Sequence, residues 1–182
     1  GSELVSGNRI EATGGFQFSD GSSGTYAQVT FALSRSDVSN QEISDTSNSA
    51  ENNEAGVFDY VDTTDGSAVS SNQTASAAGV SGDTIEDFVS GTDDYNFLSS
   101  GFGNLSTGVL TDGTNFSSIS GAYDGTNPGT NSNHSSGNPS FIFDSTDTLY
   151  FDENGSAAGY TVIATTPGTD IVASDLEIVA SL

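Results

Sequence analysis

The segment Phe141–Thr165, FIFDSTDTLYFDENGSAAGYTVIAT, combines two alternating apolar runs, a turn and clustered carboxylates. In the first run, the spacing predicts Leu149 and Phe151 on one face of a strand and Tyr150 and Asp152 on the other. The return run also alternates, with one face predicted for Thr161, Ile163 and Thr165 and the other for Tyr160, Val162 and Ala164. The segment therefore predicts a β-hairpin closed by the turn DENGSAAG.

This turn carries oxygen atoms suited to a hard cation. Asp152 and Asn154 place carboxylate and amide oxygens around Gly155, a residue type that readily adopts a positive φ, as calcium-binding loops require. Asp144 and Asp147 add negative charge nearby. A solvated turn without metal is the alternative, because Asp, Asn and Gly also favour tight turns on their own.

A second acidic segment, GDTIEDFVSGTDDYNF, covers residues 82–97 and holds five acidic residues within twelve positions. Such crowding makes each carboxylate harder to ionise unless a cation is shared, so calcium is the predicted cofactor and a solvated acidic loop the alternative. Across both segments the predicted metal ligands are Asp83, Asp87, Asp93, Asp144, Asp147, Asp152 and Asn154.

Charge and composition narrow the classes of protein. The 182 residues include 2 Lys+Arg and 25 Asp+Glu, for a formal charge of -23, which argues against nucleic acid as a partner. The absence of cysteine excludes a disulfide framework and thiolate metal sites, whereas oxygen-ligated calcium remains possible. Neither an apolar run of about 18 residues nor a charged and apolar leader is present, so we expect no membrane span and read no secretory signal.

The apolar residues predict an all-β fold. Eleven Phe and six Tyr can build a thin core between two sheets although only 33% of the chain is hydrophobic. Alternation predicts a hairpin within 10–35 and strands at 55–61 and 175–182, with a short helix around Ala75–Ala78. We predict a single domain, 1–182, folded as an antiparallel β-sandwich or jelly-roll-like domain with long loops and few short helices. Its possible substructures are an N-terminal hairpin and loop, 1–54, and a module, 55–182.

Three isolated features receive structural interpretations. Arg9 and Arg35, the only basic residues, are predicted to form local ion pairs. The tetrad DGTN occurs at Asp112 and again at Asp124, and both copies are predicted to be Asp-Gly turns. His134 stands alone in an Asn/Ser/Gly loop and is expected to be exposed and without a functional role.

Three pieces of the chain, in order, resemble the C-terminal module of RTX proteins, which are calcium-binding proteins exported by type I secretion. DTIEDF at 83–88 followed by GTD at 91–93 is similar to the family's D-x-I-x-D-F and G-x-D segment. LYFDENGS at 149–156 is similar to L-Y-Y-D-x-D-G-x, with Asn154 where the family often has Asp, and IVASDLEIVASL at 171–182 is similar to the terminal segment. The resemblance covers about residues 55–182.

The resemblance implies a secreted, calcium-stabilised β module at the end of a larger chain, which serves export, folding outside the cell and assembly. Its expected place is the cell surface, and its expected partners are calcium, other copies of the chain or a cell-surface partner. The glycine-rich nonapeptide of the family is missing, so the resemblance does not extend to a calcium β-roll within this chain.

The first functional hypothesis is a non-enzymatic structural module of a surface-layer, filament or adhesin protein. No catalytic residue is predicted, because the sequence has no nucleophile with a partner base, no H-E-x-x-H and no Gly-rich phosphate loop. One alternative is the calcium-binding and secretion appendage of a secreted hydrolase. Another is a carbohydrate-binding β-sandwich with tyrosines as stacking platforms, although Tyr in half-buried strands more often belongs to the core; these are Tyr26, Tyr60, Tyr95, Tyr123 and Tyr150.

Overall fold

The computed structural model describes residues 56–86 and 88–182 in full, and earlier in the chain the backbone of the strands β1 (Phe16–Gln17), β2 (Ser23–Gly24) and β3 (Glu42–Ile43). The chain divides into two compact units, Gly1–Leu33 and Ser34–Leu182. In the first unit β1 and β2 pair antiparallel, so a hairpin does lie within 10–35, but its second strand falls in the Gly-rich stretch SDGSSG that was predicted as the turn, and residues 25–35 lie outside the described ones. The ion pairs predicted for the two arginines lie outside the described residues.

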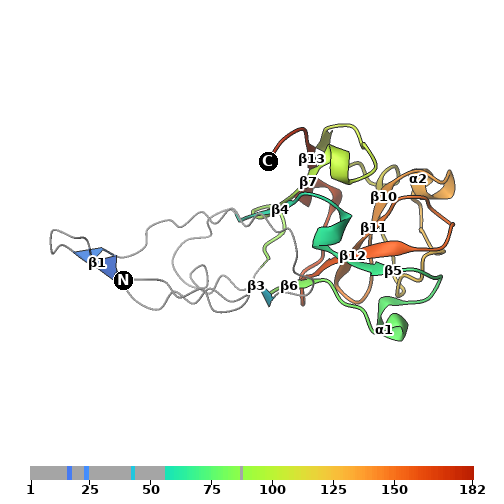
Figure 1. Cartoon of the computed structure of the whole chain (residues 1–182), viewed down its shortest axis with the longest axis horizontal. Helices are drawn as coiled ribbons and strands as arrows, with labels where there is room; N and C mark the ends of the chain where they lie inside the picture. The colour runs from blue at the N-terminus through green and yellow to red at the C-terminus, as the bar shows by residue number, and fades with distance from the viewer. Residues whose placement is uncertain (1–15, 18–22, 25–41, 44–55, 87) are drawn as a thin grey trace. The chain divides into compact units, whose positions relative to one another are not determined.

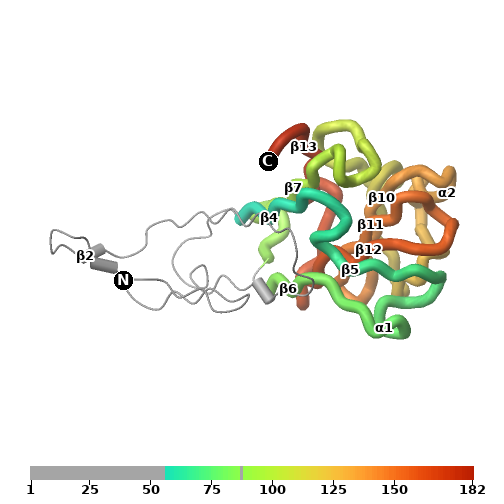
Figure 2. The backbone as a smooth tube through the Cα atoms, viewed as in Figure 1, coloured from blue at the N-terminus to red at the C-terminus, as the bar shows by residue number. Residues whose placement is uncertain are grey.

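The smaller sheet of the second unit has four strands, whose order along the sheet is β4-β7-β13-β8. The first three run parallel, and β8 is antiparallel to β13. In Figure 2, β4 lies near the start of the described region and β13 near its end. Both strands pair with β7. The bounds are β4 (Val57–Tyr60), β7 (Asp94–Leu98), β8 (Gly108–Val109) and β13 (Leu176–Val179), which confirm the strands predicted at 55–61 and in the tail.

The larger sheet contains the predicted hairpin. Its strands follow the order β3-β6-β12-β11-β10-β9, and β5 also pairs with β12 (Figure 1). β11 is antiparallel to both β10 and β12, which confirms the hairpin, whereas β9 is parallel to β10 and β6 is parallel to β12. The bounds are β5 (Ser67–Val69), β6 (Asp83–Ile85), β9 (Phe116–Ser118), β10 (Ser140–Phe143), β11 (Thr148–Asp152) and β12 (Tyr160–Thr165).

The fold is mostly β and sandwich-like, as predicted, but its sheets are mixed, so the prediction of a purely antiparallel arrangement is wrong. Parallel neighbours such as β4 and β7 need a long crossover, and here the chain between them builds β5, a short helix and β6. That helix, α1 (Ala75–Ala78), lies at the residues predicted for it, between the N-cap Thr74 and Gly79 at φ 67°. The other helical turns are α2 (Ser132–Ser135) and the 3₁₀ turns η1 (Thr63–Asp65), η2 (Ser99–Gly101) and η3 (Ala173–Asp175).

A β-bulge changes the predicted alternation of β12. Leu149 pairs with Ala164, but the next residue, Tyr150, pairs with Val162, so Ile163 is an extra residue on β12. Ile163 and Ala164 therefore both join the core between the sheets. Beyond the bulge, Thr165 lies on the same side as Val162, where the alternation had predicted opposite sides.

Both faces of the central strands are covered. Between the sheets, the ring of Phe141 lies 4.5 Å from that of Phe97 and 5.0 Å from that of Phe151, measured between centroids. On the other face Ile142 and Tyr150 pack in a second apolar cluster with Tyr123. This double burial explains why every residue of β10 and β11 is buried.

No helix in the described ranges 56–86 and 88–182 has the length and apolar character needed to cross a membrane.

We predict that Phe141→Ala destabilises the protein by about 3–5 kcal/mol, because it leaves a cavity where three aromatic rings meet. Urea unfolding followed by circular dichroism measures the change. Val109→Ala, at a side chain that is 56% exposed, is the matched control and should change the free energy of unfolding by no more than about 0.5 kcal/mol. Equal effects of the two substitutions would contradict this description of the core.

Candidate functional site

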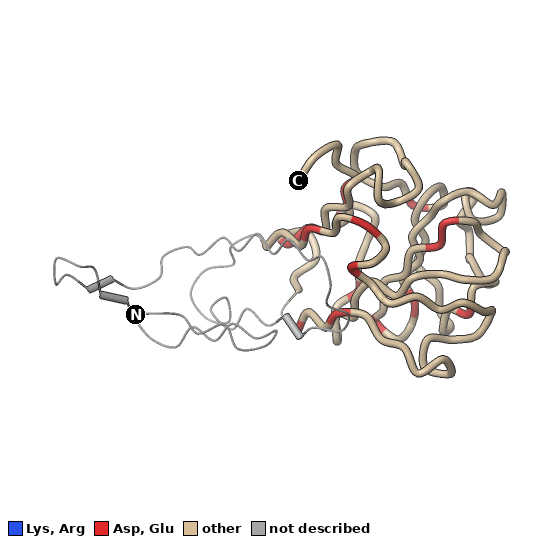
Figure 3. Tube along the Cα trace, in the orientation of Figure 1, with Lys and Arg blue, Asp and Glu red and all other residues tan. Residues whose placement is uncertain are grey.

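Buried carboxylates are the main polar feature of the described chain. Residues 56–182 contain no Lys or Arg, because the only two are Arg9 and Arg35, and Figure 3 shows acidic residues spread through a trace without basic ones. A buried carboxylate is costly unless hydrogen-bond donors compensate it. Six are at most 5% exposed: Asp65, Asp83, Asp93, Asp144, Asp152 and Asp175.

Two of these aspartates hold loops at one end of the smaller sheet. Asp93 accepts hydrogen bonds from the backbone N–H groups of Gly56 and Val89, each at 2.7 Å. Asp175 accepts a hydrogen bond at 2.7 Å from the hydroxyl of Ser90. These carboxylates therefore fasten the segments that lead into β4 and β7.

Asp144 connects three segments on the outer face of the larger sheet. Its Oδ2 atom accepts hydrogen bonds from the backbone N–H of Tyr123 and the hydroxyl of Tyr150, both at 2.8 Å. Its Oδ1 atom accepts from the backbone N–H and the hydroxyl of Thr146, at 2.8 and 2.6 Å. Four donors thus surround a carboxylate that is 1% exposed.

Tyr123, His134 and Asp152 form the closest group of titratable side chains. The Tyr123 hydroxyl donates to Asp152 Oδ2 at 2.6 Å and lies 2.7 Å from His134 Nε2, which is 3.4 Å from the same carboxylate oxygen. Because the tyrosine proton points to Asp152, we assign the histidine proton to Nε2. The three residues are at most 1% exposed, and His134 Nδ1 is buried without a hydrogen-bond partner.

The expectation that His134 is exposed is wrong. Asn131 caps α2 by accepting a hydrogen bond from the backbone N–H of His134 at 3.1 Å, which holds the ring against β11. Gly155, at φ 64°, makes this packing possible, since a Cβ atom there would lie 2.1 Å from the His134 carbonyl oxygen. Two features of the sequence could have indicated this burial: the capping residue Asn131 and Gly155 in the DENG turn. Neither of them predicts that α2 and the turn after β11 lie against each other.

Burial changes the acid-base behaviour of the tyrosines in this network. Burial raises the pKa of Tyr123, and the hydrogen bond to Asp152 and the charge of that carboxylate add to the rise. The pKa of Tyr150 is also raised, chiefly by burial, with a contribution from Asp144. Burial, with smaller contributions from Asp124 and Asp144, raises the pKa of Tyr160 to about 12. These hydroxyls therefore stay protonated, and those of Tyr123 and Tyr150 act as donors to carboxylates, whereas that of Tyr160 donates to the Gln73 carbonyl.

The predicted metal ligands occupy several separate places. Asp83 accepts a hydrogen bond from the Tyr60 hydroxyl at 3.2 Å, and Asp93, Asp144 and Asp152 are the buried acceptors described above. Asp147, at φ 56°, accepts from the backbone N–H of Gly168 at 2.8 Å. Asn154 is exposed, and its backbone N–H donates to Asp152 at 3.0 Å.

Asp87 lies outside the described residues. Among the residues that are described, no three His, Cys, Asp or Glu side chains come together in a way that could hold a metal ion. The buried carboxylates that were predicted as ligands already accept protein donors. The calcium assignment remains a prediction.

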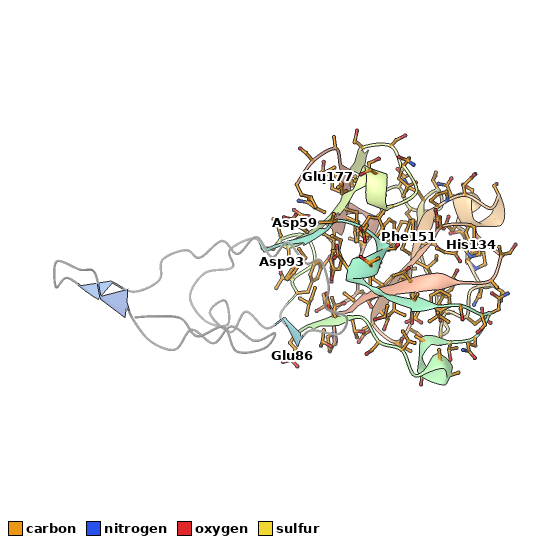
Figure 4. All side chains as sticks on the ribbon, in the orientation of Figure 1. Asp59, Glu86, Asp93, His134, Phe151 and Glu177 are labelled. Atoms are coloured by element: carbon orange, nitrogen blue, oxygen red, sulfur yellow. The ribbon has the colours of Figure 1, made fainter. Side chains whose placement is uncertain are left out.

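The buried network positions loops. Through Tyr123 it ties the loop between β9 and α2 to Asp144 at one end of β11 and to Asp152 at the other. In Figure 4, His134 lies on the β10 side of the unit, whereas Asp59, Asp93 and Glu177 lie on the side of the smaller sheet. Sequence reasoning missed Tyr123 as the centre of the network, because nothing local to GAYDGTN indicates partners at positions 134 and 152.

Comparisons of the chain with models of known protein families, with curated proteins and with solved structures found no match.

We predict that Tyr123→Phe lowers the free energy of unfolding by about 1–3 kcal/mol, because it leaves Asp152 and His134 buried with fewer partners. Chemical denaturation of the purified chain measures this. Tyr160→Phe is the control, since it removes one partly buried bond to the Gln73 carbonyl at 2.8 Å and should cost about 0.5–1.5 kcal/mol. A Tyr123→Phe protein as stable as the wild type would contradict a structural role for the network.

We also predict that the protein loses stability in alkaline solution. Burial raises the pKa of Tyr95, Tyr123, Tyr150 and Tyr160 above the value of about 10 for an exposed tyrosine. Their neutral forms therefore contribute stability that is complete below about pH 10 and is lost as the pH rises through the folded-state values. Tyrosinate absorbance and circular dichroism should change together in one transition. Ionisation of all tyrosines near pH 10 without unfolding would contradict the prediction.

Proposed function

We propose that this chain is a non-enzymatic structural module, stabilised by calcium, of an extracellular surface-layer, filament or adhesin protein exported by type I secretion. The observation that carries the structural part of the proposal is the use of buried aspartates to fasten loops to two aromatic sheets. The two oxygens of Asp144 alone hold three segments. Such fastening suits a module that keeps its shape outside the cell without disulfides.

The excess of negative charge supports the proposal that calcium stabilises the module. Partial desolvation raises the pKa of Asp94, and nearby Asp175, Glu177 and Asp93 raise it further, so negative charges repel one another at this end of the smaller sheet. No Lys or Arg in residues 56–182 offsets them. A divalent cation bound to the folded chain would relieve the repulsion and add stability.

The edges of the smaller sheet support assembly between copies. In the described part of the chain, β4 pairs only with β7 and β8 pairs only with β13. An edge strand can accept a strand from a neighbouring molecule. Calcium between copies would offset the repulsion expected from a charge of -23 on each chain.

Carbohydrate stacking gains no support from the described tyrosines. Tyr60, Tyr95, Tyr123 and Tyr150 are at most 3% exposed, so none of their rings presents an open face on which a sugar could stack. Tyr26 lies outside the described residues.

We predict that calcium raises the melting temperature and that a chelator reverses the rise, whereas magnesium at the same concentration has a smaller effect. Binding to the folded chain alone should add about 2.7 kcal/mol at a hundredfold excess over Kd. Asp147→Asn is the sharpest variant, because asparagine tolerates the positive φ of this position and removes only the charge. Asp124→Asn, at an Asp-x-Thr turn outside the predicted ligand set, is the control.

Only Asp147→Asn should reduce the calcium-induced rise. Electron microscopy of the same samples should show ordered sheets or fibres with calcium and separate particles with chelator. A melting temperature indifferent to chelation would refute the calcium assignment, and monomers under every calcium condition would refute assembly.

A further inference from the structure

A groove of about 420 Å³ lies on the outer face of the larger sheet, and neither the loop-fastening network nor the proposed assembly accounts for it. This volume suits a small molecule. Tyr150 and Val162 contribute from the sheet, and Ala75 and Val80 come from α1 and the residues after it. Three hydroxyl-bearing side chains complete the sheet side: Thr146, Thr148 and Thr165.

The bulge on β12 creates this hydroxyl row. Because Ile163 is the extra residue, Thr165 turns to the side of Val162 and comes within 3.2 Å of the hydroxyl of Thr148 on β11. Regular alternation would have put Thr165 on the other face of the sheet. The row of hydroxyls in the groove therefore depends on the bulge in β12 as well as on the loops.

The hydroxyl protons of Tyr150, Thr146 and Thr148 are directed into the protein. Tyr150 and Thr146 both donate to the buried carboxylate of Asp144, at 2.8 and 2.6 Å. Thr148 donates to the Thr146 carbonyl at 3.1 Å, and its oxygen lies 3.2 Å from the hydroxyls of both Thr146 and Thr165. A hydroxyl has one proton and two acceptor lone pairs, so the sheet side of the groove presents mainly acceptors.

The buried negative charge of Asp144 also favours a ligand that carries hydrogen-bond donors. Among the described residues of 56–182, which contain no Lys or Arg, Asp144 is compensated by hydrogen bonds. Acceptors above a buried carboxylate favour a ligand that brings donors and positive charge, and they disfavour an anion. Val162 and Ala75 are buried, at 1% and 8% exposure, so the apolar surface open to a methylene chain comes from Val80, which is half-buried, and Ala122, which is exposed.

We propose that this groove binds a small primary amine, with the ammonium group at the Thr148 and Thr165 hydroxyls and the alkyl chain against Val80 and Ala122. An alkylammonium ion carries three donors and no acceptor, which complements a wall of acceptors. Its methylene groups fill the apolar side of the groove, as the stem of a lysine does on an apolar protein surface.

Titrations monitored by methyl and amide NMR test the proposal on the full chain. Pentylamine, pentanol and pentanoate share one carbon skeleton and differ only in the head group. Pentylamine should bind about tenfold more tightly than pentanol, pentanoate should not bind, and the shifts should centre on Val80 and Ala122. Equal binding of amine and alcohol, or shifts elsewhere, would overturn the proposal without any variant.

Thr148→Val and Thr165→Val remove acceptors with little change in volume, and each should weaken pentylamine binding about tenfold. Thr161→Val is the matched control on β12, because Thr161 lines a different groove and should leave binding unchanged. Unchanged binding in both test variants, with folding verified by their melting curves, would overturn the proposal.

Two further titrations separate the amine from other cations. N-acetyl-lysine methylamide should bind more weakly than pentylamine because its two amide groups do not fit the apolar side of the groove; tighter binding would assign the site to a protein lysine instead. Millimolar calcium should leave pentylamine binding at Val80 intact, and competitive displacement would make the groove a metal site. A failure of calcium to stabilise the fold bears on the proposed function and leaves the amine prediction standing.

Discussion

The structure depends on hydrogen bonds from neutral donors to buried carboxylates. Most proteins can pair a buried acidic group with Lys or Arg, but residues 56–182 contain neither. Asp93, Asp144 and Asp152 instead accept from backbone N–H groups and from tyrosine or threonine hydroxyls. Each of these hydrogen bonds requires a donor at one particular place in a loop. The aspartates therefore define the loop positions more closely than apolar contacts would.

Periodicity predicted the strands but not their partners. The alternation at 141–165 and 55–61, together with the small residues Ala75–Ala78, placed β11, β12, β4 and α1 correctly. Strand direction depends on how the long loops cross over, and the Ser-, Thr- and Asn-rich connections carry no periodic signal for it. The mixed sheets therefore could not be read from the same pattern that predicted the strands.

The acidic residues show why composition is an incomplete guide to a site. Crowding at residues 82–97 suggested a shared cation, yet Asp93 is buried as an acceptor for two backbone N–H groups while its neighbour Asp94 is exposed. Sequence alone does not separate these roles, because both residues look equally acidic. Burial separates them, since a sealed carboxylate with full hydrogen bonding fixes a loop, whereas exposed ones remain available to cations.

His134 and Thr165 were both misplaced by local reasoning, and for related reasons. A lone histidine in a polar loop lacks any local partner, but Gly155 allows the turn after β11 to approach α2 and seal the ring. One extra residue in β12 likewise reverses the side on which Thr165 lies. In both cases a single backbone feature moves a polar side chain into a new set of neighbours. The chemistry of this fold is therefore set where its regular pattern is interrupted, at a close glycine contact and at a bulge.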